Sequence, residues 1–156
     1  MIPLNKSTAT EKIIIQISDT HLMDHPDATF VEMNPESSFH AVIEDILKHY
    51  PQIDAIVHTG DLAQVAKPET YARYQAFMQK LNIPFYQIPG NHDDIQFFPF
   101  ETPDPMPTVL AFAEWRIVLL NSAVPKKIDG WINSEQLEHL KMILAANQQY
   151  SVVLAC

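Results

Sequence analysis

The sequence predicts an α/β protein in which strands and helices alternate around a mainly parallel sheet. Three short apolar runs in the first half are separated by segments with apolar residues at helical spacing, the pattern of right-handed βαβ units. The length of 156 residues, with 47% hydrophobic and 19% charged residues, is that of one globular domain. A domain of this size buries roughly 70% of the surface of its unfolded chain, so its core needs no disulfide or structural zinc.

The first half of the chain contains three predicted strands and two predicted helices. Residues 13–18 form a β-branched run without regular polar alternation, which is typical of a strand covered on both faces. Asn34 is a predicted N-cap before Pro35, and Pro51 closes the helix that follows. The other predicted elements here are a strand at 54–59, a helix that opens at 67–69 and has apolar residues inward through 81, and a strand at 85–88.

The second half begins with a predicted loop, residues 94–108, that carries four prolines and three phenylalanines. We expect this loop to pack over the edge of the core, with a substrate-facing flap as the alternative. Ser134 is the predicted N-cap of a last amphipathic helix. Further strands are predicted at 109–113, 115–121 and 151–155.

Composition and charge exclude several classes of protein. The net charge of −9 opposes broad nucleic-acid binding, but it permits a small phosphorylated substrate if a metal ion supplies positive charge. The chain has no apolar run of the about 18 residues that a membrane-spanning helix needs, and residues 1–12 form a polar N-terminal tail without signal-peptide features. The single cysteine, Cys156, suits a reducing compartment, so we expect a cytoplasmic protein without membrane association.

The scarcity of glycine excludes three common catalytic or nucleotide-binding motifs. Only Gly60, Gly90 and Gly130 occur, so neither the P-loop nor the dinucleotide-binding glycine pattern can be written in this chain. The nucleophile elbow of serine hydrolases is excluded for the same reason.

Polar residues with metal-binding groups follow each of the first three predicted strands. In an open parallel sheet, ligands bind beyond the carboxyl ends of the strands, so we expect these groups to share one site. One such residue alone is most often an ordinary turn residue, and only the three strand ends together carry the signal. The residues are Asp19 and His21 after the first strand, Asp61 after the second, and Asn91 and His92 after the third.

The types of donor group indicate which metal would bind. Carboxylates, an imidazole and a carboxamide without a thiolate favour manganese or iron, with zinc possible. Asp61 is placed to bridge two cations, and a pair about 3.5–4 Å apart would hold a hydroxide and neutralise both oxygens of an in-line phosphoryl displacement. His92 is placed to stabilise the transition state or to protonate the leaving alkoxide.

In this order, the segments Asp19-Thr20-His21, Gly60-Asp61 and Gly90-Asn91-His92-Asp93 resemble the calcineurin-like metallophosphoesterase family. The resemblance extends to the single-domain bacterial branch that hydrolyses cyclic nucleotides, and it covers the chain from Lys12 onward. It implies a metallophosphoesterase-type βαβ sandwich. It also implies that Asp19 and His21 bind a first divalent metal ion, Asp61 bridges, Asn91 binds the second ion, and His92 is the catalytic histidine.

Family members continue beyond the position of Cys156 with a histidine directly after the last strand and, later, a Gly-His-x-His motif. The resemblance therefore implies that residues 13–156 are the N-terminal portion of a metallophosphoesterase domain, without three metal-ligand histidines and the C-terminal part of the second sheet. We expect weak metal binding, because water must replace imidazole. We also expect an open apolar sheet face that favours a homo-oligomer.

Functions of two different classes are compatible with these features. The first is a two-metal phosphodiesterase acting on a small phosphodiester such as a 3′,5′-cyclic nucleotide, with other phosphodiesters and phosphomonoesters left open. The alternative is a catalytically inactive truncated fragment that acts as an oligomeric or partner-binding module. A flavodoxin-like nucleotide-binding module without metal is a distant third.

The other histidines have mainly structural interpretations. His58 lies within the second predicted strand, and we expect it to be packed. His25, in a loop, is the only one considered as a replacement metal ligand. The histidines expected at the surface or edge of helices are His40, His49 and His139.

Overall fold

The computed structural model describes residues 11–125 and 127–156, and these contain three helices and six strands. Each predicted element is present within two residues of its predicted bounds. Most of the predicted N-terminal tail, residues 1–10, lies outside the described residues. In chain order the elements are β1 (Ile14–Ile17), α1 (Pro35–His49), β2 (Ala55–Thr59), α2 (Pro68–Lys80), β3 (Phe85–Ile88), β4 (Thr108–Phe112), β5 (Trp115–Leu119), α3 (Ser134–Ala146) and β6 (Ser151–Ala155).

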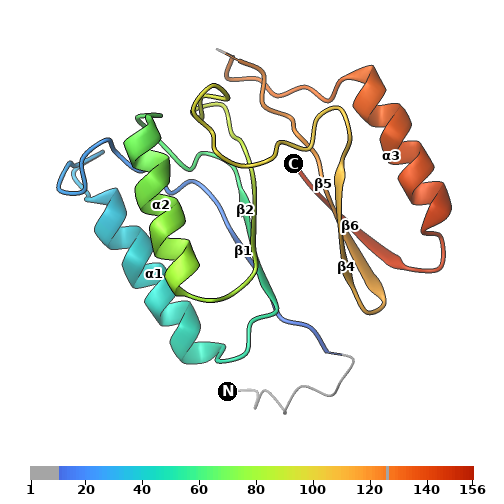
Figure 1. Ribbon diagram of the computed structural model, residues 1–156, viewed down its shortest axis with the longest axis horizontal. Helices are drawn as coiled ribbons and strands as arrows, with labels where there is room; N and C mark the ends of the chain where they lie inside the picture. Colours follow the sequence, from blue (N-terminus) through green and yellow to red (C-terminus); the bar gives the residue numbers. More distant parts are fainter. Residues whose placement is uncertain (1–10, 126) are drawn as a thin grey trace.

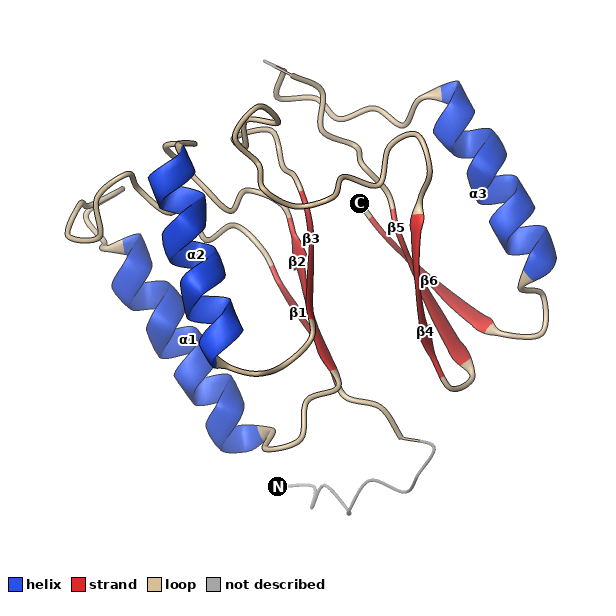
Figure 2. Ribbon diagram, viewed as in Figure 1, coloured by secondary structure: helices blue, strands red, loops and turns tan. Residues whose placement is uncertain are grey.

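The elements form four layers, with two sheets face to face between helices (Figure 1). One sheet has the order β1-β2-β3 and is parallel throughout. In the other, β4 pairs with β5 antiparallel and β5 pairs with β6 parallel. Helices α1 and α2 cover the outer face of the first sheet, and α3 covers the outer face of the second (Figure 2). The predicted α/β class and mainly parallel pairing are therefore confirmed.

The strands of the first sheet differ in burial because of their positions. β2 lies in the middle, and four of its five residues are buried. β1 lies at the edge, pairs within the described residues only with β2, and exposes Gln16. Both faces of β1 are nevertheless covered in part, because Ile15 and Ile17 pack against the cluster under the helices and Ile14 packs between the two sheets.

Alternate residues of the strands supply three apolar clusters. On β2, Ile56 packs among the residues of α1 and α2, while its neighbour Val57 packs between the two sheets. On β5, Leu119 faces the first sheet and Val118 faces α3. This alternation is the period of a strand, and each such buried side chain contributes about 1.5–3 kcal/mol.

The helix starts show one confirmed cap and one correction. The side chain of Asn34 accepts a hydrogen bond from the Ser37 N–H at 2.7 Å, as its predicted N-cap role requires. Ser134 is not the cap of α3, because Asn133 takes that position and accepts from the Gln136 N–H at 2.8 Å. Asparagine and serine are both good N-caps, so adjacent residues of these types leave the start of a helix ambiguous by one position.

The proline-rich loop between β3 and β4 packs against the helical side of the first sheet. Phe98 is buried and its ring contacts Tyr71, while the Phe100 ring contacts those of Tyr74 and Phe85. The expected packing over the core edge is therefore what the structure shows. Among the described residues, none of the helices has the length and apolar character required to cross a membrane.

Candidate metal centre

The loops after β1 and β2 are joined by backbone hydrogen bonds that continue beyond the strands. The Asp19 N–H donates to the Gly60 carbonyl at 3.1 Å, and the His21 N–H donates to the Asp61 carbonyl at 3.0 Å. Because the strands are parallel and adjacent, their carboxyl ends meet at one edge of the sheet. The fold therefore brings the predicted donor residues of these two loops side by side.

The carboxylates of two predicted ligands lie close to an imidazole nitrogen of a third. His21 Nε2 lies 3.6 Å from Asp19 Oδ1 and 3.9 Å from Asp61 Oδ2. These separations are too long for hydrogen bonds. Donor atoms that bind one cation at about 2.0–2.2 Å lie roughly 3–3.5 Å apart, so this spacing fits a shared cation after small adjustments. The donor set and its spacing are thus compatible with a divalent metal ion.

His92 lies beside this group and is tied to it through the backbone. One ligand atom from each of His21, Asp61 and His92 lies within 4.8 Å of the others. The rings of His21 and His92 stand edge to face with centroids 5.1 Å apart. The His92 N–H donates to Asp61 Oδ1 at 2.9 Å, which leaves Asp61 Oδ2 facing His21.

A cavity of about 180 Å³ opens beside Asp61. Asp19, Asp61 and Asn91 all line it, so Asn91 faces the same cavity as the two carboxylates. Cys156, to which the sequence assigned no role in the site, lines the same cavity from the end of β6. The loop around Gly130 forms another part of the wall.

Three of the predicted ligands have left-handed backbone conformations. The φ angles are 57° for Asp19, 45° for His21 and 52° for Asp61. Non-glycine residues rarely adopt positive φ, and the strain of about 1–3 kcal/mol that each one stores is typical of functional sites. The backbone is therefore bent at the three positions whose side chains meet around His21 Nε2.

Gly90 is required by the position of Asp61. A Cβ atom at residue 90 would lie 2.1 Å from Asp61 Oδ1 and 2.3 Å from the Asp61 backbone nitrogen. Any side chain would therefore displace the loop after β2. The absence of a side chain at residue 90 therefore lets the loops after β2 and β3 approach each other at Asp61.

Asp93 has a structural role in the site that its place in the Gly90-Asn91-His92-Asp93 segment does not reveal. Its carboxylate accepts hydrogen bonds from the backbone of Leu62 and Ala63 at 3.1 Å each, from Gly90 N–H at 2.9 Å, and from the Tyr71 hydroxyl at 2.9 Å. Burial raises the pKa of this carboxyl, and the hydrogen bonds oppose that shift. Asp93 thus fastens the loops after β2 and β3 to each other and to α2.

Two other histidines can be placed relative to the site. His58 is fully buried, its Nδ1 lies 3.0 Å from the Tyr74 hydroxyl, and burial lowers its pKa to about 3. It is therefore a packed, neutral residue, as expected. The His25 side chain is 69% exposed, and its Nδ1 accepts a hydrogen bond from the Asp27 N–H at 3.3 Å. Among the described residues, His25 does not belong to the group formed by His21, Asp61 and His92, so its predicted role as a replacement ligand has no support.

Comparison with known proteins identifies related sequences over nearly the whole chain. A family model described as "Calcineurin-like phosphoesterase" matches residues 13–148. A protein of Pseudomonas aeruginosa named 3′,5′-cyclic adenosine monophosphate phosphodiesterase CpdA is 28% identical over 94% of this chain and 55% of its own length. The protein of the same name from Haemophilus influenzae is 33% identical over 90% of this chain and 53% of its own length.

A third relative, a "Probable cyclic nucleotide phosphodiesterase" of Psychrobacter arcticus, is 30% identical over 85% of this chain and 54% of its own length. The chain thus spans about half the length of the curated relatives it matches. The family match covers the three strand-end segments whose side chains converge in the structure. The chain therefore belongs to the calcineurin-like phosphoesterase family.

Proposed function

We propose that this chain carries the metal-binding half of a metal-dependent phosphodiesterase that hydrolyses a small phosphodiester such as a 3′,5′-cyclic nucleotide. The observation that supports this most is the convergence of Asp19, His21 and Asp61 at the carboxyl ends of adjacent parallel strands. The names of the related bacterial proteins favour a cyclic nucleotide as the substrate.

Each residue of the centre has a proposed role toward two divalent ions, manganese or iron being preferred to zinc. Asp19 and His21 would hold the first ion, Asn91 the second, and Asp61 both. Carboxylate, imidazole and carboxamide groups suit these metals. When bound, such ions supply positive charge to the phosphoryl group and lower the pKa of water.

The chain's own groups position the reacting atoms. The imidazole of His92 is exposed and lies beside His21. The hydrogen bond from the His92 N–H to Asp61 holds the backbone that carries this imidazole. From this position the imidazolium would donate a proton to the leaving alkoxide oxygen. Asp93 makes no contact with substrate in this proposal and acts as a positioning residue, because it fastens the loops that carry Asp61 and His92.

Binding of Mn²⁺ tests the centre directly, and Asp61→Asn is the informative variant. Asparagine tolerates the left-handed backbone at position 61 and keeps one oxygen acceptor, so the fold should survive while the charge is lost. Asp27→Asn is the matched control, because the Asp27 carboxylate is 92% exposed and lies 3.9 Å from His25 Nδ1, outside the centre. We expect titration calorimetry with Mn²⁺ to show binding that Asp61→Asn abolishes and Asp27→Asn preserves. Equal binding by the two variants would refute the proposed ligand set.

Activity is tested with 3′,5′-cyclic AMP in the presence of Mn²⁺, followed by ³¹P NMR. We expect hydrolysis to be lost in His92→Ala, while metal binding changes little. If turnover were the same in His92→Ala as in the unchanged chain, the proposed role of this histidine would be wrong.

The alternative function is an oligomeric or partner-binding module, and one feature of the second sheet favours it. Trp115, Val153 and Leu154 on β5 and β6 are 50%, 42% and 49% exposed. A cavity of about 490 Å³ between the two sheets is lined in part by Trp115 and Val153. Light scattering on the purified chain tests self-association. A monomer at every concentration, together with hydrolysis that depends on His92, would exclude this alternative.

A further inference from the structure

A second cavity shares a wall with the metal centre. Its volume is about 350 Å³, within the range of about 300–1,000 Å³ that is common for small-molecule sites. Asp19 and His21 line it on the side of the centre. The opposite walls come from the loop before α1 and from α1 itself, with mainly apolar side chains: Phe30, Val31, Met33, Phe39 and Val42.

The rim of this cavity exposes apolar side chains that the fold does not bury. Val31 is 79% exposed, Met33 is 55% exposed and Val42 is 49% exposed. Scattered exposed apolar residues are ordinary, but three that surround one cavity form a patch of the kind that marks binding sites. The Phe30 ring stands 5.5 Å from the His21 ring, so the apolar wall continues directly into the metal centre.

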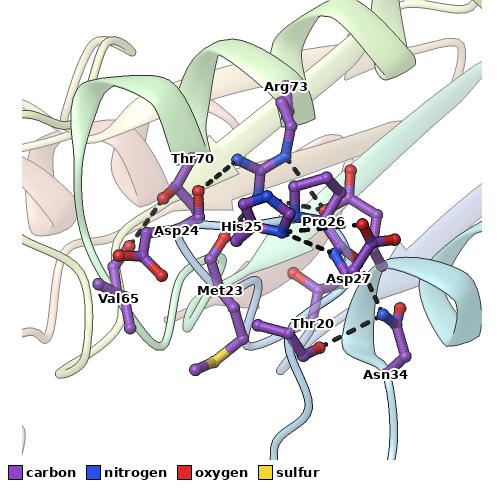
Figure 3. A network of polar contacts seen from close by, with 12 residues as sticks. Thr20, Met23, Asp24, His25, Pro26, Asp27, Asn34, Val65, Thr70 and Arg73 are labelled. Atoms are coloured by element: carbon purple, nitrogen blue, oxygen red, sulfur yellow. Dashed lines mark hydrogen bonds and ion pairs between the residues drawn. The ribbon is translucent and has the colours of Figure 1, made fainter.

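The loop that forms the outer wall is held in place by α2. The Arg73 guanidinium donates to the carbonyl oxygens of Met23 and Asp24, the latter at 3.0 Å, as Figure 3 shows. It also pairs with Glu36 of α1 at 3.3 Å, and Lys67 pairs with the Asp24 carboxylate at 2.8 Å. These contacts thus hold the start of the loop, at residues 23 and 24, and the first turn of α1, and the loop residues that line the cavity lie between these two points.

The tip of this loop has a strained backbone. Val31 and Glu32 have φ angles of 48° and 63°, between paired backbone hydrogen bonds that join Phe30 to Met33. A β-branched residue at positive φ is a genuine outlier, and asparagine or glycine would suit the position better. The apolar Val31 side chain at the cavity rim is thus present despite its backbone cost.

We propose that this cavity is the subsite for the heterocyclic base of the substrate, with its apolar walls against the ring and its open side toward the phosphoryl group at the metal centre. The inference rests on the proposed phosphodiesterase function and deepens it, because it assigns the residues that would contact the base of a nucleotide substrate. Aromatic and apolar side chains on two sides of a slot are suited to a planar ring.

Adenosine is the probe, because it carries a base without a phosphate, and the experiment uses the chain without added metal. Two-dimensional NMR follows the backbone amides during titration. We expect saturable shifts centred on Phe30, Val31 and Val42, with a dissociation constant in the millimolar range. In Val31→Asn, which loses apolar contact but relieves the backbone, binding should weaken about fivefold while the unfolding temperature stays the same or rises.

Glu32→Asn is the matched control, because residue 32 shares the positive φ but does not line the cavity. It should leave adenosine binding unchanged. Val42→Phe, which fills the cavity from α1, should also weaken binding. Shifts that do not saturate, shifts centred elsewhere, or equal losses in Val31→Asn and Glu32→Asn would overturn the subsite. Since neither metal nor phosphate is present, such a failure is separate from a failure of the Mn²⁺ titration that tests the metal centre.

Discussion

Replacing Gly90 by alanine tests whether the loops after β2 and β3 are interlocked as the structure shows. The new Cβ would lie 2.1 Å from Asp61 Oδ1 and 2.3 Å from the Asp61 nitrogen, whereas real Cβ contacts are essentially never shorter than 3.0 Å. The backbone nitrogen must therefore retreat by about 0.7 Å, and the carboxylate by about 0.9 Å. Because one of the contacted atoms is backbone, a side-chain rotation cannot relieve the clash.

Such a displacement moves Asp61 away from His21 and disturbs its bond from the His92 N–H. Loss of a group that orients metal ligands typically costs 10- to 100-fold in metal affinity, so we expect Mn²⁺ binding to weaken by about that factor. Overpacking should also lower the free energy of unfolding by about 1–3 kcal/mol. Calorimetric titration gives the first quantity and urea unfolding gives the second.

Gly130→Ala is the matched control for this experiment. Residue 130 also lines the cavity, but its added Cβ would only reach 3.0 Å from the Ser122 carbonyl, which a shift of a few tenths of an ångström relieves. We expect near-normal Mn²⁺ binding in this variant. If Gly90→Ala bound Mn²⁺ as well as Gly130→Ala does, the argument that Gly90 positions Asp61 would be refuted.

Three further outcomes are expected. Asp93→Asn places an NH₂ group where the carboxylate now accepts, so chemical denaturation should show a loss of about 2 kcal/mol in unfolding free energy, and an unchanged value would count against the fastening role. Burial lowers the pKa of His58 from 6.5 to about 3. Between these two pH values the unfolded chain binds a proton at His58 and the folded chain does not, so the free energy of unfolding decreases as the pH falls. The unfolding temperature should therefore decrease less with falling pH in His58→Leu than in the unchanged chain. Equal decreases in the two proteins would contradict the lowered pKa of His58. Asp19→Gly should weaken Mn²⁺ binding without lowering the unfolding temperature, because glycine adopts a positive φ without strain. A clear drop in the unfolding temperature would contradict the claim that the backbone is strained at residue 19.

The sequence predicts the order of elements well because local signals suffice for it. Asn34 before Pro35 marks a helix start through chemistry confined to one turn, and the structure has that cap. The strand-end residues were selected on a general property of parallel sheets, and the structure brings Asp19, His21 and Asp61 together. Their role as metal ligands stays a prediction.

Features that depend on distant contacts could not be predicted in this way. The edge position of β1 follows from sheet order, which no local pattern specifies. The role of Asp93 depends on backbone donors about thirty residues earlier in the chain, at Leu62 and Ala63. The loop beside the centre is tied down by Arg73, whose contacts with Asp24 and Glu36 look like ordinary surface chemistry in the sequence.

The backbone bonds between the loops after β1 and β2 have a consequence for biosynthesis. Every side chain proposed for the centre, together with Asp93, belongs to residues 19–93, and within the described residues the last strand of the sheet that orders them ends at Ile88. On a ribosome, this βαβαβ unit can therefore close while the second sheet is still being translated. A nascent chain could assemble its cation-binding groups first and add β4, β5 and β6 to a surface that already exists.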